Sequence, residues 1–203
     1  MDLALIVKAV RALRSGRVGD AAAYKAAAFA SAAHPDVERR LRRLACPFPT
    51  IDLRELDALP IGTFGHAYVA FMHVRRLTPI VVSPEVADEL VASHLLAVRY
   101  PIVHDAFHVL LGFGTDLPGE LGVWTFVAEQ GSCRSFERAA ALARSLYPVV
   151  APHRRAQLAR ARVRGLALAR SAACLIAEPL ETFWQDPLAD VRRALRIPLH
   201  DGG

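Results

Sequence analysis

Helical periodicity is the feature that most limits what this chain can fold into. Apolar residues recur at helical spacing among abundant alanine and leucine, and no stretch alternates polar and apolar residues between hairpin turns. The chain of 203 residues is long enough for one sizeable core, and no Gly/Ser-rich linker divides it. The sequence therefore predicts an all-α fold: a single-domain helical bundle spanning residues 1–203.

Proline, glycine and capping residues mark the joints between the expected helices. Thr63 is an expected N-cap, and Ser83 followed by Pro84 is typical of a helix start. Pro101 should kink or restart the helix that begins there, because proline lacks the N–H that a helix interior needs. Residues 78–84 should form an extended connector. The expected helices are 3–14, 20–32, 35–45, 63–76, 84–99, 104–111, 118–131, 135–147, 153–177 and 187–196.

The chain is more apolar than a typical water-soluble protein. Its hydrophobic fraction is 53%, yet no run free of charged residues approaches the ~20 residues that a membrane-spanning helix needs. The excess apolar surface can form an interior cavity, an oligomer interface or a membrane-facing patch. The composition does not choose among these three.

The formal net charge of +5 comes almost wholly from arginine, since Lys8 and Lys25 are the only lysines. This bias fits genome composition as readily as function, so no nucleic-acid partner is expected. Two arginine clusters, within residues 39–43 and 154–164, can attract anionic lipid heads or form solvated helix faces.

Three cysteines, Cys46, Cys133 and Cys174, are widely spaced and form no CxxC pair. This is typical of buried thiols in a reducing compartment. The first seventeen residues are amphipathic and basic, but Asp2 and the lack of a serine-rich stretch argue against a transit peptide. The segment is therefore interpreted as the first helix of a cytoplasmic protein.

The run HDAFHVLLGFGTDLPGE gathers four good metal ligands: His104, Asp105, His108 and Glu120. Helix positions i, i+1 and i+4 can converge on one ion. The glycines and proline of residues 112–118 then break the chain, which lets Glu120 approach from the start of the next helix. Two imidazoles with two carboxylates suit zinc, manganese or iron(II).

The alternative is that these are ordinary helix residues, with Asp105 a solvated charge. Apolar residues surround the histidines, which places the segment against a core, where charged groups need partners. Asp105 can also act as an outer-shell partner of a histidine instead of a ligand.

Three stretches resemble one known family. The run RYPIVHDAFHVLLGFGTDLPGELGVW resembles the HDxxH signature, followed after eleven residues by Glu, of the Coq4 family of coenzyme Q biosynthesis proteins. LPIGTFGHAYVAFM, 59–72, is similar to the glycine-containing helix entry of that family, and FWQDPLADVRRALRI, 183–197, to its C-terminal segment. The resemblance is close over 59–131, moderate over 183–197, and elsewhere limited to helical character.

The resemblance implies a divalent metal, usually described as zinc, bound by His104, Asp105, His108 and Glu120, which would also be the catalytic residues. It further implies an all-helical dimer that associates peripherally with membranes and with other quinone-biosynthesis enzymes. The implied reaction is oxidative decarboxylation at C1 of a polyprenylated hydroxybenzoate-type ring.

A long isoprenoid tail needs an apolar groove lined by several helices. Aromatic residues near the motif are candidates for this lining, although core packing explains them equally well. The candidates are Phe64, Tyr68, Phe71, Met72 and Trp124, with Phe126. Three further histidines could contact the head group of the lipid: His66, His73 and His94. For each, the preferred interpretation is a histidine that is hydrogen-bonded within the fold or exposed to solvent.

Two other functions remain open. One is a non-catalytic scaffold that binds the prenyl lipid, holds a structural metal and presents quinone precursors to other enzymes. The other is an HD-type phosphohydrolase, which would combine His104 and Asp105 with His66 and Asp186.

Overall fold

The structure is a computed structural model, and it describes residues 1–30 and 32–198. Over these residues the chain forms ten α-helices and three short 3-10 helices, with two isolated bridges and no strand, so the all-α prediction is confirmed. The α-helices are α1 (Leu3–Arg14), α2 (Val18–Phe29), α3 (Pro35–Leu41), α4 (Leu53–Asp57), α5 (Phe64–Arg75), α6 (Pro84–Leu111), α7 (Leu117–Glu129), α8 (Arg134–Val150), α9 (Arg155–Ser171) and α10 (Leu188–Ala194).

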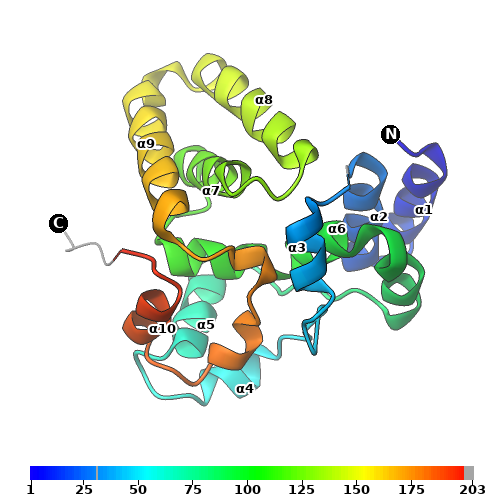
Figure 1. Cartoon of the computed structure of the whole chain (residues 1–203), viewed down its shortest axis with the longest axis horizontal. Coiled ribbons are helices and arrows are strands. Elements are labelled where there is room, and N and C mark those ends of the chain that lie inside the picture. The colour runs from blue at the N-terminus through cyan, green and yellow to red at the C-terminus, as the bar shows by residue number, and fades with distance from the viewer. Residues whose placement is uncertain (31, 199–203) are drawn as a thin grey trace.

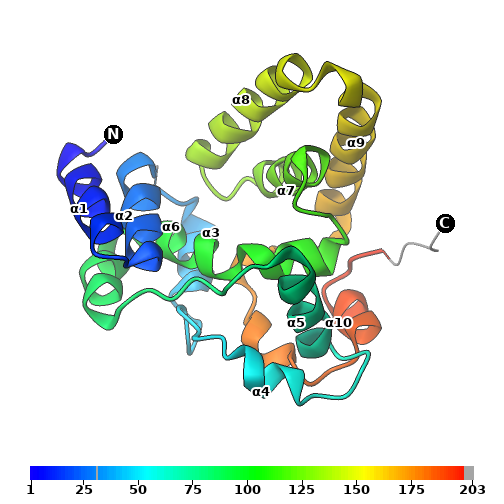
Figure 2. The same ribbon diagram turned by 180° about the vertical axis from the view of Figure 1, so that it is seen from behind.

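The long helix α6 runs through the middle of the molecule (Figure 1). Helices α1 and α2 lie at the end where α6 begins, α7, α8 and α9 lie on one side of it, and α4, α5 and α10 lie on the other (Figures 1 and 2). Nearly every residue of α6 from 95 to 111 is buried, and these residues belong to the principal hydrophobic core. The second half of α6 is therefore a central support onto which the other helices pack.

The kink in α6 lies at His94, and the prediction that Pro101 would interrupt the helix is wrong. His94 has non-helical angles of φ −135° and ψ 28°, whereas the helix continues through Pro101 to Leu111. The buried neighbours Tyr100, Ile102 and Val103 pack into the core and hold the helix together around the partly buried Pro101, and this packing outweighs the loss of one backbone hydrogen bond. Near the kink, Arg42 donates a hydrogen bond of 2.7 Å to the carbonyl of Ala92.

Several helix ends also differ from the sequence prediction, and tertiary contacts explain them. The expected helix 35–45 ends at Leu41, and the chain beyond it delivers the carbonyls of Cys46 and Pro47 to the side chain of Arg99. The expected helix 153–177 is divided into Pro152–Arg154, α9 and Leu175–Ala177, because the side chain of Gln130 bonds the backbone of residues 173 and 175. The short α4 was not expected.

The predicted starts of two helices are confirmed. The Thr63 side chain accepts a hydrogen bond from the His66 N–H at the start of α5, and Pro84 occupies the first turn of α6 after Ser83. Residues 77–83 form the expected extended connector.

The three cysteines are free, as expected, but they differ in exposure. Cys133 is buried and Cys174 partly buried, whereas Cys46 is exposed, so the prediction of a buried thiol is wrong there. The turn that presents the Cys46 carbonyl to Arg99 accompanies this exposure.

None of the helices in the described part of the chain combines the length and the apolar character that crossing a membrane requires.

Candidate metal centre

His104 and His108 form one half of the candidate centre. They lie one turn apart on α6, so both side chains leave the same face of the helix. Their Nε2 atoms are 3.1 Å apart, and the two rings are nearly perpendicular, at 87°. His108 is buried, and His104 is partly exposed. The two Nε2 lone pairs are thus presented to one point beside the helix.

Glu120 supplies the other half from the first turn of α7. Its Oε1 lies 3.4 Å from Nε2 of His108, and its Oε2 lies 3.6 Å from Nε2 of His104. Asp116 is the N-cap of α7 and accepts a hydrogen bond from the Gly119 N–H, which fixes the direction in which the helix starts. As predicted, the group lies between two consecutive helices.

The turn that brings Glu120 to the histidines depends on close backbone contact. Gly112 ends α6 with φ 67°, in the left-handed region that favours glycine. At Gly119 an added Cβ would lie 1.9 Å from the carbonyl oxygen of Gly114, so only glycine allows the loop to pack against the start of α7. The residue that precedes Glu120 is therefore part of what places its carboxylate.

We expect Gly119→Ala to destabilise the metal-free protein by about 1–3 kcal/mol, because the methyl group would push the loop away from α7. The same displacement should weaken zinc binding. Urea unfolding and chelator competition measure the two effects. Gly131→Ala is the control: its φ of 63° makes alanine strained, but the added methyl meets nothing within 4 Å. That variant should lose stability and keep its zinc affinity. Wild-type stability in Gly119→Ala would contradict the prediction.

The three side chains have the donor types and the spacing that a divalent ion requires. Ligand atoms about 2.0–2.2 Å from a shared ion lie roughly 3–3.5 Å from one another. The three separations between His104, His108 and Glu120 are 3.1, 3.4 and 3.6 Å. The group could therefore hold a divalent ion, and two imidazoles with one carboxylate suit zinc or iron(II).

The electrostatics of Glu120 favour the ionised form that a ligand needs. Burial by itself raises the pKa of this carboxyl group, but hydrogen bonds and charge from His104 and His108 outweigh burial and lower the pKa to about 2. The carboxylate is therefore charged throughout the physiological pH range.

Asp105, the fourth predicted ligand, is not part of this group. Its pKa is raised, first by burial and also by the charge of Glu120, while the two histidines act in the opposite direction. The charge of Asp105 also contributes to the raised pKa of the buried Tyr68, after burial itself. Asp105 thus lies near the centre without sharing the point on which the other three converge.

Aromatic rings hold the two imidazoles in place. The ring of Phe71, on α5, stacks on the His108 ring with 5.8 Å between the ring centroids. The rings of Tyr100 and His104 meet in an edge-to-face arrangement, with 5.1 Å between their centroids. The Nδ1 atoms of both histidines are buried and have no hydrogen-bond partner among the described residues. Sequence reasoning missed Tyr100. The signal that would have found it is its position four residues before His104, on the same helix face.

The predicted tail-lining residues fall into two sets. One set is completely buried in the principal core and consists of Phe64, Tyr68 and Met72. There the ring of Trp184 packs against the rings of Phe64 and Tyr68, with centroid distances of 4.5 and 5.2 Å. Phe71 and Trp124 are partly buried and lie beside the centre. Phe71 contacts His108, and Trp124 contacts Tyr100 at 5.6 Å. Phe126 is also completely buried.

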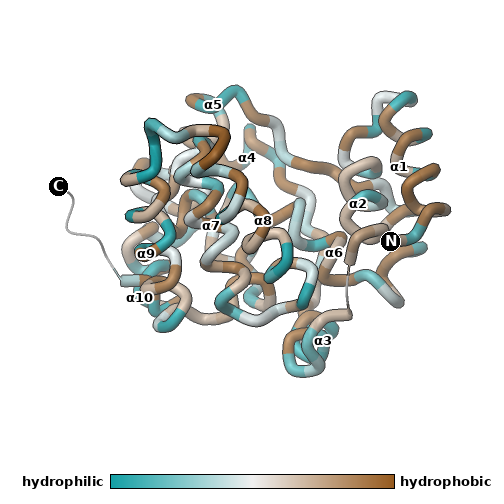
Figure 3. The backbone as a smooth tube through the Cα atoms, turned by 90° about the horizontal axis from the view of Figure 1, so that it is seen from above, coloured by the Kyte–Doolittle hydropathy of each residue, from teal (hydrophilic) through white to brown (hydrophobic). Residues whose placement is uncertain are grey.

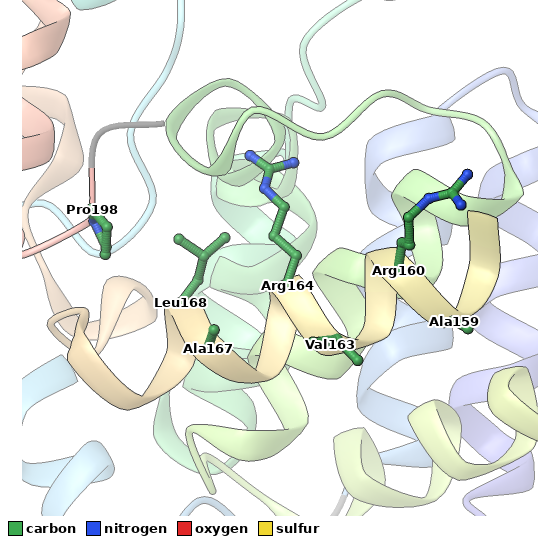
Figure 4. A pocket seen from close by; sticks show the side chains of 7 residues that line it. All are labelled: Ala159, Arg160, Val163, Arg164, Ala167, Leu168 and Pro198. Atoms are coloured by element: carbon green, nitrogen blue, oxygen red, sulfur yellow. The ribbon is translucent and has the colours of Figure 1, made fainter. Parts of the chain in front are cut away.

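A pocket of about 570 Å³ lies along α9, lined by residues within 159–168 and by Pro198 (Figure 4). A second, of about 280 Å³, lies between α9 and the loop that joins α6 to α7. Neither pocket is lined by a predicted metal ligand or a predicted tail-lining residue.

The group differs from the set that an HD-type phosphohydrolase needs, since it contains neither His66 nor Asp186. Asp186 is exposed, and His66 is partly buried. His73 is exposed, and His94 is partly buried at the kink of α6.

Fold and site together define an all-α protein with a candidate metal centre made by a histidine pair on one helix and a glutamate from the next. The sequence profile described as "Coenzyme Q (ubiquinone) biosynthesis protein Coq4" matches residues 43–201, and the chain belongs to this Coq4 family.

Relatives of known name support the assignment. The chain is 32% identical over 152 residues to the ubiquinone biosynthesis protein COQ4 homolog, mitochondrial, of Bos taurus, which covers 73% of this chain and 55% of that protein. The homolog from Danio rerio is 31% identical over 160 residues, covering 77% and 57%. The chain thus spans little more than half the length of these relatives.

A solved structure of similar fold is that of a putative ubiquinone biosynthesis protein from Nostoc punctiforme. Its TM-score is 0.64 at 21% sequence identity, and the match covers 97% of this chain and 96% of that one. This likeness supports the helical architecture.

Proposed function

We propose that this chain acts in the biosynthesis of ubiquinone or a related prenylquinone, as a metal-dependent enzyme that replaces the C1 carboxylate of a polyprenylated hydroxybenzoate-type ring by a hydroxyl. The observation that carries the proposal is the convergence of His104, His108 and Glu120 in a chain of the Coq4 family. Three protein donors leave at least one position for water or substrate, as catalytic sites do and closed structural sites do not.

The residues have separate tasks in this reaction. A bound divalent ion, with zinc proposed first and iron or manganese as alternatives, would supply a Lewis acid for the phenolate and carboxylate oxygens of the ring. His104, His108 and Glu120 would hold it, and Tyr100 and Phe71 would keep the imidazoles oriented. The exchange of carboxylate for hydroxyl removes two electrons from the substrate, so dioxygen is proposed as the oxidant. Since dioxygen accepts four electrons, two carboxylated rings and one dioxygen would give two hydroxylated rings and two molecules of carbon dioxide.

The buried Asp105 is proposed to assist beside the ion, as a fourth ligand or as an outer-shell partner. We expect Asp105→Asn to weaken zinc binding by about 10- to 100-fold, the loss usual for an outer-shell partner, and His108→Ala to weaken it more. Chelator competition on both purified variants makes the comparison. Equal losses in the two variants would identify Asp105 as a ligand.

Phe71 and Trp124, which flank the centre, are proposed to contact the start of the prenyl tail, together with Phe64, Tyr68 and Met72 if α5 moves to admit it. The protein is proposed to work as a homodimer at the inner face of a membrane, with other quinone-biosynthesis enzymes.

Helix α1 supports the proposed membrane contact. It exposes four apolar side chains among basic ones, and its turns alternate between apolar and polar colour (Figure 3). The exposed apolar residues are Leu3, Val7, Val10 and Leu13. We expect the protein to float with anionic vesicles, and Val7→Asp to reduce that binding, because charge on the apolar face opposes insertion. Equal flotation of both proteins would exclude α1 as the contact.

The decisive experiment for the reaction incubates the purified, metal-analysed protein with a prenylated hydroxybenzoate under labelled dioxygen. Mass spectrometry should show loss of the carboxylate and gain of one oxygen atom, and Glu120→Gln should show neither. Tight binding of the lipid without turnover, with any added metal, would replace the enzyme by a non-catalytic scaffold that presents quinone precursors.

A further inference from the structure

The C-terminal end of α6, just after His108, is held by two arginines from distant parts of the chain. A helix leaves its last carbonyl groups without partners inside the helix. Here Arg192 of α10 donates from Nε to the carbonyl of Leu110 and from Nη2 to that of Val109, both at 2.9 Å. One guanidinium therefore spans two consecutive carbonyls through a rigid, planar fork of donors, which a lysine ammonium on its flexible stem lacks.

Arg164 of α9 binds the next two carbonyl groups in the same way. Its Nη1 donates to the carbonyl of Gly112 at 3.0 Å, and its Nη2 donates to that of Leu111. Figure 4 shows that Arg164 leaves α9 on the same side as Arg160. Every carbonyl from residue 109 to 112 is thereby bound by a charged donor.

Placing two guanidinium groups together has a cost that the helix end offsets. The pKa of Arg164 is lowered by burial and then by the charge of Arg192, and burial also lowers the pKa of Arg192. The C-terminus of α6 carries the negative end of the helix dipole, so it favours cations at this place. The two guanidinium groups repel each other, and their bonds to the carbonyl groups at this helix end hold them together.

The contact reaches Glu120 as well as His108. The Arg164 guanidinium lies over the ring of Phe113 at 4.3 Å. That ring packs on Gly122 of α7, where an added Cβ would lie 2.4 Å from it. Arg164 therefore packs the loop after α6 against α7 at Gly122, which lies two residues after Glu120.

We propose that Arg164 and Arg192 are positioning residues of the metal centre. By holding the last turn of α6 and the loop that follows, they fix the separation between the histidine pair and Glu120, and α10 becomes a structural requirement of the centre. This inference rests on the proposed metal site, and it adds a role for two residues that lie outside the ligand group.

The test compares zinc affinities of purified full-length variants by chelator competition. Arg192→Met removes the fork and keeps the length of the side chain, and Arg192→Lys keeps the charge alone. Arg193→Met is the matched control, because Arg193 is the next residue on α10, is exposed and, within the described part of the chain, its side chain pairs with Asp190 alone. We expect about 10- to 100-fold weaker zinc binding in Arg192→Met and in Arg164→Met, a smaller loss in Arg192→Lys, and no change in Arg193→Met.

Cobalt(II) absorption spectra provide a second readout that lost stability alone would not move. Variants that have lost the positioning contact should show altered ligand-field bands even under saturating cobalt. Wild-type zinc affinity and wild-type cobalt spectra in Arg192→Met and Arg164→Met would overturn the inference, whatever their melting temperatures. A wrong assignment of the metal site would give a different result, because the wild type and His108→Ala would then bind zinc equally weakly.

Discussion

Replacing His108 by alanine should abolish the retention of zinc by the purified protein. His108 is buried, and its Nε2 is the atom nearest to the two other members of the group, at 3.1 and 3.4 Å. Of the converging group, removing it leaves His104 and Glu120, which are two donors where a stable site needs at least three, and Asp105 does not share their point of convergence. We expect the affinity for zinc to fall by more than about 100-fold, beyond the loss expected for an outer-shell partner.

Two measurements check this expectation. Metal analysis after gel filtration should find stoichiometric zinc in the wild type and background zinc in His108→Ala. Zinc at 100 times its dissociation constant should stabilise the wild type by about 2.7 kcal/mol and leave the variant unchanged. His73→Ala, at an exposed histidine of α5, is the control and should behave as wild type. Full stoichiometric zinc in His108→Ala would refute the assignment of the ligands.

The largest loss of stability should follow the replacement of Arg99 by leucine. Arg99 is completely buried in α6, and its guanidinium joins two loops to that helix. It donates to the carbonyls of Cys46 at 3.3 Å and Pro47 at 2.8 Å on one side, and to those of Ile176 at 2.9 Å and Glu178 at 2.7 Å on the other. Removing it would leave four carbonyl groups without their charged donor.

Arg99 also pairs with Glu181, at 3.4 Å. Breaking a buried ion pair by removing one partner typically costs about 3–5 kcal/mol, and we expect Arg99→Leu to lose at least that much of the free energy of unfolding. Since the total is only about 5–15 kcal/mol for most domains, the variant should be barely folded at 37 °C.

Chemical denaturation of the metal-free protein measures the loss. Arg99→Lys should lose most of the same stability, because an ammonium group cannot reach carbonyls on two sides at once. Arg170→Leu is the control: Arg170 is exposed, lies 3.8 Å from Glu129 and should contribute less than about 0.5 kcal/mol. A loss below about 1 kcal/mol in Arg99→Leu would show that the two loops stay in place without it.

The spacing of the candidate ligands was predictable because it depends on helix geometry. Positions i and i+4 share a face in any α-helix, so His104 and His108 had to lie side by side once the segment was helical. The approach of Glu120 was also foreseeable, since Gly112 and Pro118 require a turn between the helices. The exclusion of Asp105 from the group was not foreseeable, because adjacent side chains diverge by an amount that the packing of α6 decides.

The kink of α6 shows why local signals were not enough elsewhere. Pro101 carries the strongest local signal for a break, yet the surrounding core keeps the helix intact there, and the break falls at His94, which carries no such signal. In the same way, nothing near residues 99, 164 and 192 in the sequence indicates that these three arginines bind backbone carbonyls from segments 52 to 83 residues away.

The sequence by itself determined the helical class, the positions of most helix starts and the identity of the ligand candidates. These properties follow from hydrophobic periodicity, capping and turn chemistry, all of which act between residues close in the chain. Only the tertiary structure decided which candidates converge, where α6 bends and which arginines hold its end. These depend on contacts between residues far apart in sequence, and their energies arise only once the helices have packed and excluded water.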